Sequence, residues 1–110
     1  MVNDAFLARV KPGATLVNTA RGELFDNQAV LRALLSGRLG HIAVDTLFPE
    51  PTPADHPLVA LPPEIADRAV YSPHLGGITG GFFRRAHANM WNSLRLVTEG
   101  KRPNFIVNGL

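Results

Sequence analysis

The distribution of apolar and polar residues in the first half of the chain predicts a strand, a helix and a second strand. Ala14–Thr19 is rich in β-branched and apolar residues and has the length of a buried strand. Asn27–Ser36 carries valine and leucine at helical spacing, with Asp26 before it as a helix cap and Gly37 after it as a stop signal. His41–Leu47 has the pattern of another buried strand. This order is a βαβ unit, which implies a parallel sheet.

The second half of the chain predicts a long loop, a short strand and a long helix. Phe48–Pro63 contains six of the nine prolines and is therefore expected to be mostly irregular. Ala69–Ser72 is a third strand candidate. Thr79–Thr98 repeats large apolar residues every three or four positions, which is typical of an amphipathic helix. Beyond it, Phe105–Val107 could form an added strand or an arm against a partner.

These elements together predict an α/β fold, namely half of a doubly wound parallel sheet (βαβ plus a third strand) with a long C-terminal helix. No repeat or shift in composition marks a second complete domain. An open half-sheet has an exposed edge and uncovered faces, which normally pack against further chain or another subunit. We therefore expect a homo-oligomer.

Composition narrows the classes of function. With 45% hydrophobic and 18% charged residues in 110, the chain is expected to be globular. The net charge of +2 comes from scattered basic residues, which argues against nucleic-acid binding. There is no cysteine, no metal-ligand spacing and no apolar run of roughly twenty residues that would span a membrane. We expect no metal and no membrane partner, and a cytoplasmic location as the default.

Polar residues follow each of the three predicted strands. Arg21 comes after the first strand, the segment Asp45–Glu50 after the second, and His74 after the third. Ligands bind beyond the carboxyl ends of the strands in open parallel sheets, so these residues are expected to share one crevice.

Each of these side chains suits one step of a proton-transfer reaction on an anionic substrate. Imidazole titrates near neutral pH, which suits His74 to take and return a proton. Glu50 stands between two prolines on a stiff segment and could orient that imidazole. Arg21 offers a planar fork of donors to a carboxylate. The alternative for each is an ordinary surface residue with no catalytic role.

Glycine pairs flank the predicted start of the last helix, at Gly76-Gly77 and Gly80-Gly81. Free backbone amides there could face an anion, although flexible entry into the helix explains the glycines equally well. No glycine spacing in the chain fits the dinucleotide fingerprint G-x-G-x-x-G.

Three sequence blocks closely resemble the successive signature blocks of the D-isomer-specific 2-hydroxyacid dehydrogenases. They are Val17–Leu24, Ala43–Asp45 with Pro49–Pro51, and Ser72–Gly77. The resemblance covers nearly the whole chain and implies a partial Rossmann-like sheet, NAD as cofactor with NADP not excluded, and a small 2-hydroxy or 2-keto acid as substrate.

The resemblance also implies residue roles. Arg21 would bind the substrate carboxylate and polarise its carbonyl, His74 would be the general acid and base, and Glu50 would hold His74. Positions that would lie against the cofactor are Thr19, Ala20, Arg21, Asp45, His74, Gly76 and Gly77.

The chain also departs from the family's pattern. Family members are much longer and carry a substrate domain and a G-x-G-x-x-G loop before the region that matches here. We therefore expect residues 1–110 to be the C-terminal part of an NAD-binding domain that lacks the glycine loop and the substrate domain. Two hypotheses follow, a dehydrogenase fragment that is inactive in isolation, and a catalytically inactive interaction module that self-associates.

Overall fold

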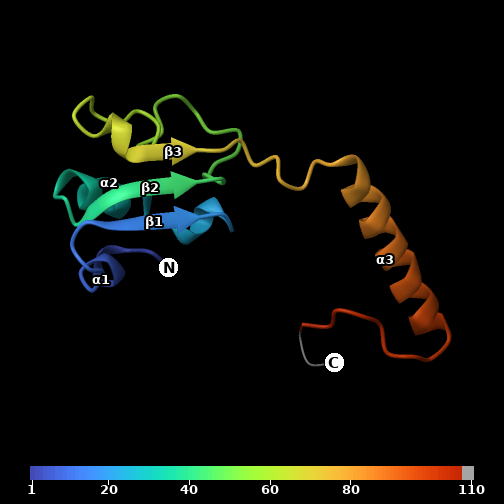
Figure 1. Ribbon diagram of the computed structural model, residues 1–110. Coiled ribbons are helices and arrows are strands. Elements are labelled where there is room, and N and C mark those ends of the chain that lie inside the picture. Colours follow the sequence, from blue (N-terminus) through green and yellow to red (C-terminus); the bar gives the residue numbers. More distant parts are fainter. Residues whose placement is uncertain (108–110) are drawn as a thin grey trace. The chain divides into compact units, whose positions relative to one another are not determined.

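The computed structural model describes residues 1–107, and its contacts divide the chain into one unit, Met1–His74, and a second that begins at Leu75. Figure 1 labels the main elements. In chain order, the elements are α1 (Asp4–Leu7), β1 (Ala14–Asn18), the 3-10 turn η1 (Gly22–Leu24), α2 (Asn27–Leu35), β2 (Leu39–Val44), the 3-10 turn η2 (Ala66–Arg68), β3 (Ala69–Tyr71) and α3 (Gly80–Thr98).

The first unit is built on a parallel sheet in the order β1-β2-β3. Figure 1 shows the three strands running in the same direction. Val17, Ala43 and Val70 stand at the same register position on successive strands. The α/β class, the βαβ unit and the parallel third strand predicted from the sequence are confirmed, and all three strands end at one edge of the sheet.

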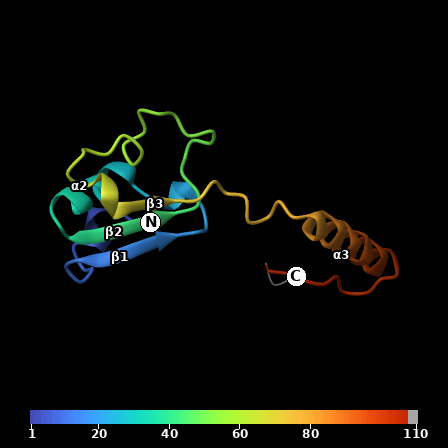
Figure 2. The ribbon, with the colours of Figure 1, turned by 45° about the horizontal axis from the view of Figure 1, so that its top comes forward.

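One face of this sheet holds the core. Val30 and Leu34 of α2 are fully buried, as is Leu39 at the start of β2. The helix packs against β2, and Figure 2 gives a second view of this layer. Asp26 caps α2, because its Oδ1 accepts a hydrogen bond of 3.0 Å from the backbone N–H of Ala29. The predicted helix and its cap are thus confirmed.

The second strand is displaced from its predicted bounds, His41–Leu47. It begins earlier, at Leu39, and ends at Val44. Its end follows from β1, since the buried side chain of Asn18 accepts from Ala20 N–H and donates to the carbonyl of Arg21, which turns the chain out of the sheet. Without a paired neighbour, the chain after Val44 leaves the sheet within a few residues.

The proline-rich segment Phe48–Pro63 is irregular, as predicted, and a buried histidine anchors it. His56 Nδ1 accepts from the backbone N–H of Leu58 at 3.1 Å, so the neutral ring carries its proton on Nε2. Nε2 lies 3.2 Å from the carbonyl of Phe48 and 2.9 Å from the side-chain amide of Asn27 at the start of α2. His56 therefore ties the middle of the loop to the loop's first residue and to the start of α2.

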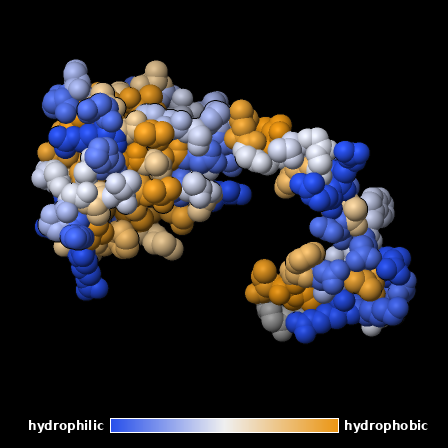
Figure 3. Space-filling view, viewed as in Figure 1, coloured by the Kyte–Doolittle hydropathy of each residue, from blue (hydrophilic) through white to orange (hydrophobic). Residues whose placement is uncertain are grey.

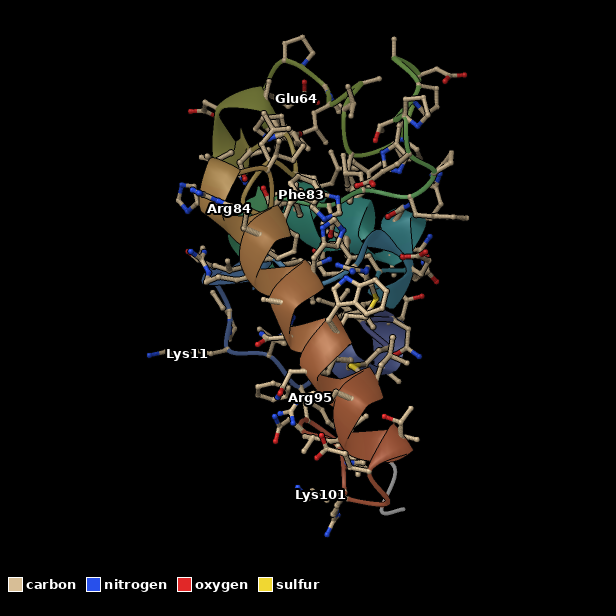
Figure 4. All side chains as sticks on the ribbon, turned by 90° about the vertical axis from the view of Figure 1, so that its right-hand side faces the viewer. Lys11, Glu64, Phe83, Arg84, Arg95 and Lys101 are labelled. Carbon is tan, nitrogen blue, oxygen red and sulfur yellow. The ribbon has the colours of Figure 1, made fainter. Side chains whose placement is uncertain are left out.

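In the second unit, α3 begins after Thr79, whose hydroxyl accepts from Phe82 N–H at 3.1 Å. None of its residues is buried. Phe83, Arg84 and Arg95 project from the helix in Figure 4, and apolar surface is visible in both units in Figure 3. The large apolar side chains exposed on α3 are Phe82, Phe83, Met90, Trp91, Leu94 and Val97.

The structure also bears on the strand expected near the C-terminus and on the length and polarity of the helices. Phe105–Val107 forms no strand with any other part of residues 1–107, so the added strand is not observed. Within the same residues, every helix is too short or too polar to cross a membrane.

Candidate functional site

The three residues predicted to share a crevice do so. Arg21, Glu50 and His74 line one hollow of about 280 Å³ at the carboxyl ends of the strands. Their placement on one side of the sheet follows from the parallel topology, which brings the end of every strand to the same edge. The remaining lining residues are Gly22, Glu23, Thr46, Leu47 and Phe48.

His74 and Glu50 form the closest polar pair in this hollow. His74 Nδ1 lies 3.0 Å from Oε1 and 3.1 Å from Oε2 of Glu50. An ionised carboxylate only accepts hydrogen bonds, so it selects the tautomer with the proton on Nδ1 and leaves a lone pair on Nε2. The two side chains are 39% and 46% exposed, so a small molecule can reach them. The predicted contact between these residues is confirmed, while their catalytic roles stay predictions.

The backbone of His74 has an unusual conformation. Its φ is 53°, in the left-handed region that residues with a side chain seldom adopt. The backbone N–H of His74 donates to Asp45 Oδ1 at 3.2 Å, and the hydroxyl of Ser72 donates to the same oxygen at 2.5 Å. A half-buried carboxylate at the end of β2 thus lies directly beside the turn that presents the imidazole.

Arg21 is held at the hollow by a tight approach between two backbone segments. A Cβ at Gly22 would lie only 2.3 Å from the carbonyl carbon of Leu47, so no other residue fits there without moving one of the segments. Arg21 itself is exposed, and its Nη1 donates to the carbonyl of Ala20 at 2.6 Å. Within residues 1–107 no carboxylate pairs with it, so its positive charge is available to an anion.

A second hollow, of about 360 Å³, shares Glu50 and His74 with the first. Tyr71 lines it and donates from its hydroxyl to the carbonyl of Leu58 in the proline-rich loop. Burial raises the pKa of Tyr71 above its usual value, because the ionised form loses hydration. The other residues around this hollow are Val44, Asp45, Leu47, Pro51, Thr52, Ser72 and Pro73.

The structure does not bring every predicted cofactor residue into these hollows. Thr19 and Ala20 are exposed and line neither of them, and Gly76 and Gly77 belong to the unit that begins at Leu75. Their contact with a cofactor remains a prediction. Among residues 1–107 there is no cluster of His, Cys, Asp and Glu side chains with the arrangement of a metal site.

Sequence reasoning did not single out several residues at the site. Thr46 is 2% exposed, and its hydroxyl has no hydrogen-bond partner. Tyr71 and Ser72 border the second hollow. All three stand at strand ends, so the rule that located His74 could have found them. Nothing in the sequence indicated that His56 is buried.

A family model matches residues 1–76, and its description is D-isomer specific 2-hydroxyacid dehydrogenase, NAD binding domain. Among curated relatives, the formate dehydrogenase of Pseudomonas sp. (strain 101) is 48% identical over 92% of this chain and 24% of its own length. The glyoxylate reductase of Thermofilum pendens is 32% identical over 98% of this chain and 30% of its own length. The chain therefore spans roughly a quarter to a third of the length of these relatives.

A solved structure of a D-isomer specific 2-hydroxyacid dehydrogenase also matches most of the chain. A D-isomer specific 2-hydroxyacid dehydrogenase from Xanthobacter autotrophicus Py2, in complex with NADPH and MES, superposes with a TM-score of 0.77 at 30% identity. The match covers 94% of this chain and 40% of that one.

Proposed function

Because the chain belongs to the D-isomer specific 2-hydroxyacid dehydrogenase family, through its NAD-binding domain, we propose that it serves hydride transfer between NAD(P) and a small D-2-hydroxy acid. The observation that carries the proposal is the Glu50–His74 pair, which lines one hollow with the guanidinium of Arg21. No carboxylate among residues 1–107 pairs with that guanidinium. This combination provides a proton acceptor beside a site for a carboxylate.

In the direction of oxidation, the substrate loses a hydride from carbon and a proton from its hydroxyl, and becomes a 2-keto acid. His74 takes the proton on Nε2, since Nδ1 is engaged by Glu50. The carboxylate of Glu50 stabilises the imidazolium that results. In the reverse direction, the same imidazolium returns the proton to the carbonyl oxygen.

Arg21 would bind the substrate carboxylate. Its guanidinium can donate two parallel hydrogen bonds to the two oxygens, which fixes both the position and the orientation of the acid. The close approach of Gly22 to Leu47 keeps the segment that carries Arg21 beside the loop that carries Glu50. The hollow of about 280 Å³ suits a small acid of two to a few carbons.

The nicotinamide cofactor would take up the hydride when bound. Asp45 fits its amide end, because Oδ1 is engaged by Ser72 and His74 while Oδ2 has no donor among the described residues. By resemblance to the family, Thr19, Ala20, Gly76 and Gly77 would also contact the cofactor. NADP is the alternative to NAD, as one structural relative was solved with NADPH.

We propose that the 110 residues correspond to the C-terminal part of the NAD-binding domain and do not turn over alone. Holding the reacting groups in near-attack geometry can contribute about 7–11 kcal/mol, and it needs the phosphate loop and the closing substrate domain. Losing half of that contribution slows the reaction by about several hundredfold or more. NADH oxidation with glyoxylate, pyruvate and hydroxypyruvate measures this. Turnover that His74→Ala abolishes would contradict it.

Formate oxidation is a second candidate, because a relative 48% identical is a formate dehydrogenase. Formate yields carbon dioxide when it gives up its hydride, and no hydroxyl proton has to be removed. A histidine paired with a carboxylate has no proton to move in that reaction. The Glu50–His74 pair therefore favours the 2-hydroxy acid.

A chimera separates the two reactions. Residues 1–107 replace the matching segment of the Thermofilum pendens glyoxylate reductase, which supplies the rest of a complete enzyme. We expect reduction of glyoxylate with NADH or NADPH, and a loss of roughly 100-fold to 10,000-fold in kcat on His74→Ala. His87→Ala, on α3, is the control and should leave kcat unchanged. Formate oxidation that survives His74→Ala, without glyoxylate reduction, would support the second candidate.

The exposed apolar residues of α3 favour a further possibility, self-association of the chain through this helix without redox turnover. Phe83, Trp91 and Leu94 are each at least half exposed. Apolar surface of this extent on a helix normally packs against a partner. We expect light scattering to detect a dimer or larger species, weakened by Trp91→Ser. A compact monomer at high micromolar concentration would rule this out.

A further inference from the structure

We propose that Ser72 is a positioning residue for His74 and acts through the carboxylate of Asp45. The inference rests on the proposed role of His74 in proton transfer. It assigns a function to a hydroxyl that lies outside the Arg21, Glu50 and His74 set.

The reason His74 needs support is its backbone. A φ of 53° places the residue in the left-handed region, where Cβ crowds the following carbonyl oxygen. Such a conformation persists only where neighbouring groups hold it. The contact of the imidazole with Glu50 fixes the side chain, and hydrogen bonds to the backbone of His74 can fix its φ. The N–H of His74 has one such bond, to Asp45 Oδ1 at 3.2 Å.

Asp45 can hold His74 only if its own carboxylate is fixed. The hydroxyl of Ser72 donates to the same Oδ1 at 2.5 Å, a bond strengthened by the charge of the acceptor. Ser72 is itself tied to the sheet, because its N–H donates to the carbonyl of Val44 at 3.0 Å. The hydroxyl therefore connects a rigid strand end to the carboxylate that grips the His74 backbone.

The residue between Ser72 and His74 makes this arrangement necessary. Pro73 has no N–H to donate to Asp45, and it keeps Ser72 extended. Ser72 Oγ and His74 N are thus the donors that the turn can offer to one carboxylate oxygen. When the hydroxyl is removed, Asp45 can rotate away and His74 can relax to negative φ. That relaxation redirects Cβ and takes Nδ1 away from Glu50.

Nuclear magnetic resonance of the whole chain tests this without any need for turnover. A positive φ gives a strong nuclear Overhauser effect between the amide and α protons of the same residue. Long-range nitrogen–proton spectra of the neutral rings report which nitrogen of His74 carries the proton, with His41, His56 and His87 as references in the same spectrum.

We expect Ser72→Ala to weaken both signals, since a hydrogen bond to a charged group shifts an equilibrium roughly tenfold or more. Ser72→Thr keeps a hydroxyl and should retain both. Thr52→Ala removes a hydroxyl that lines the same hollow without a hydrogen bond to the described residues, and should also retain both. Asp45→Asn keeps one oxygen acceptor without the charge and should lie between Ser72→Ala and the unchanged chain.

Retention of the positive φ and of the Nδ1 proton in Ser72→Ala would overturn the inference. Core resonances of Ile42 and Leu58 report whether each variant is folded, and if Ser72→Ala unfolds, Asp45→Asn decides by the same two signals. The proposed function is judged separately by the effect of His74→Ala on turnover of the chimera. A failure of Ser72 to position His74 would therefore leave the proposed function standing. Likewise, unchanged turnover in His74→Ala would count against the proposed function but not against the contact from Ser72 through Asp45 to His74.

Discussion

The two units of the chain differ in how their apolar residues are used. In Met1–His74 the core is closed around α2 and the sheet. In α3, the long helix of the second unit, no residue is buried. The buried core and the candidate site therefore lie in the first unit, while the large apolar side chains of α3 are exposed. The buried apolar residues of the first unit are Val2, Leu7, Phe25, Ala29, Val30, Ala33, Leu34, Leu39, Ile42, Val44, Leu58 and Ile65.

The sharpest test of this difference is the same truncation in each unit. Leu34→Ala removes a fully buried side chain and should lower the free energy of unfolding by about 2–5 kcal/mol. Leu94→Ala, on α3, removes a side chain that is half exposed and should change it by less than about 0.5 kcal/mol. Urea denaturation followed by circular dichroism measures both. Equal losses would mean that α3 is packed as firmly as the core.

A smaller loss of stability is expected from a substitution at the candidate site, where Gly22 packs against Leu47. Gly22→Ala places a methyl group 2.3 Å from the carbonyl carbon of Leu47 and should destabilise the first unit by about 1–3 kcal/mol. Gly76→Ala is the matched control, because a Cβ there meets nothing within 4 Å. Thermal unfolding of the two variants measures the difference. A Gly22→Ala protein as stable as the control would show that the two segments are free to separate.

The smallest expected change in the free energy of unfolding comes from the contact between β3 and the proline-rich loop. Tyr71→Phe removes the hydrogen bond to the carbonyl of Leu58 and should cost about 0.5–1.5 kcal/mol at neutral pH. Burial raises the pKa of Tyr71 in the folded chain. The folded state therefore holds this proton more tightly than the unfolded state, and the corresponding stability is present below about pH 10 and lost as pH rises further.

Tyr71 is the only tyrosine, so ultraviolet absorbance follows its titration directly. The decline in stability above about pH 10 should be shallower in Tyr71→Phe than in the unchanged chain. A tyrosine that titrates at its ordinary pKa, or identical declines in the two proteins, would show that this side chain is not held against the loop.

The sequence predicted the features that depend on local pattern and topology. Asp26 and Thr79 were placed at helix starts, and the parallel order of the strands brought Arg21, Glu50 and His74 to one edge. Features that depend on the path of a loop could not be predicted. The positive φ of His74 and the contact from Ser72 to Asp45 arise only once β2 and β3 are paired.

The end of β2 and the burial of His56 could not be predicted either, because both depend on contacts with other segments of the chain. The second strand ends at Val44 because Asn18 turns its neighbour out of the sheet, which no periodicity in β2 itself could reveal. The burial of His56 depends on the proline-rich loop folding back toward Asn27, and prolines indicate only that such a loop is irregular.

We propose that Met1–His74 alone presents an anion site, at Arg21, beside a proton acceptor, His74. Titrating the isotope-labelled chain with glyoxylate tests this directly, since glyoxylate combines a carboxylate with a carbonyl. We predict that the resonances of Arg21, Thr46 and His74 shift in a saturable manner while those of α3 do not. Arg21→Gln should abolish the shifts, whereas Arg9→Gln, in the exposed turn after α1, should retain them. Shifts that survive Arg21→Gln, or that fall on α3 alone, would show that Arg21 and His74 do not form this anion site.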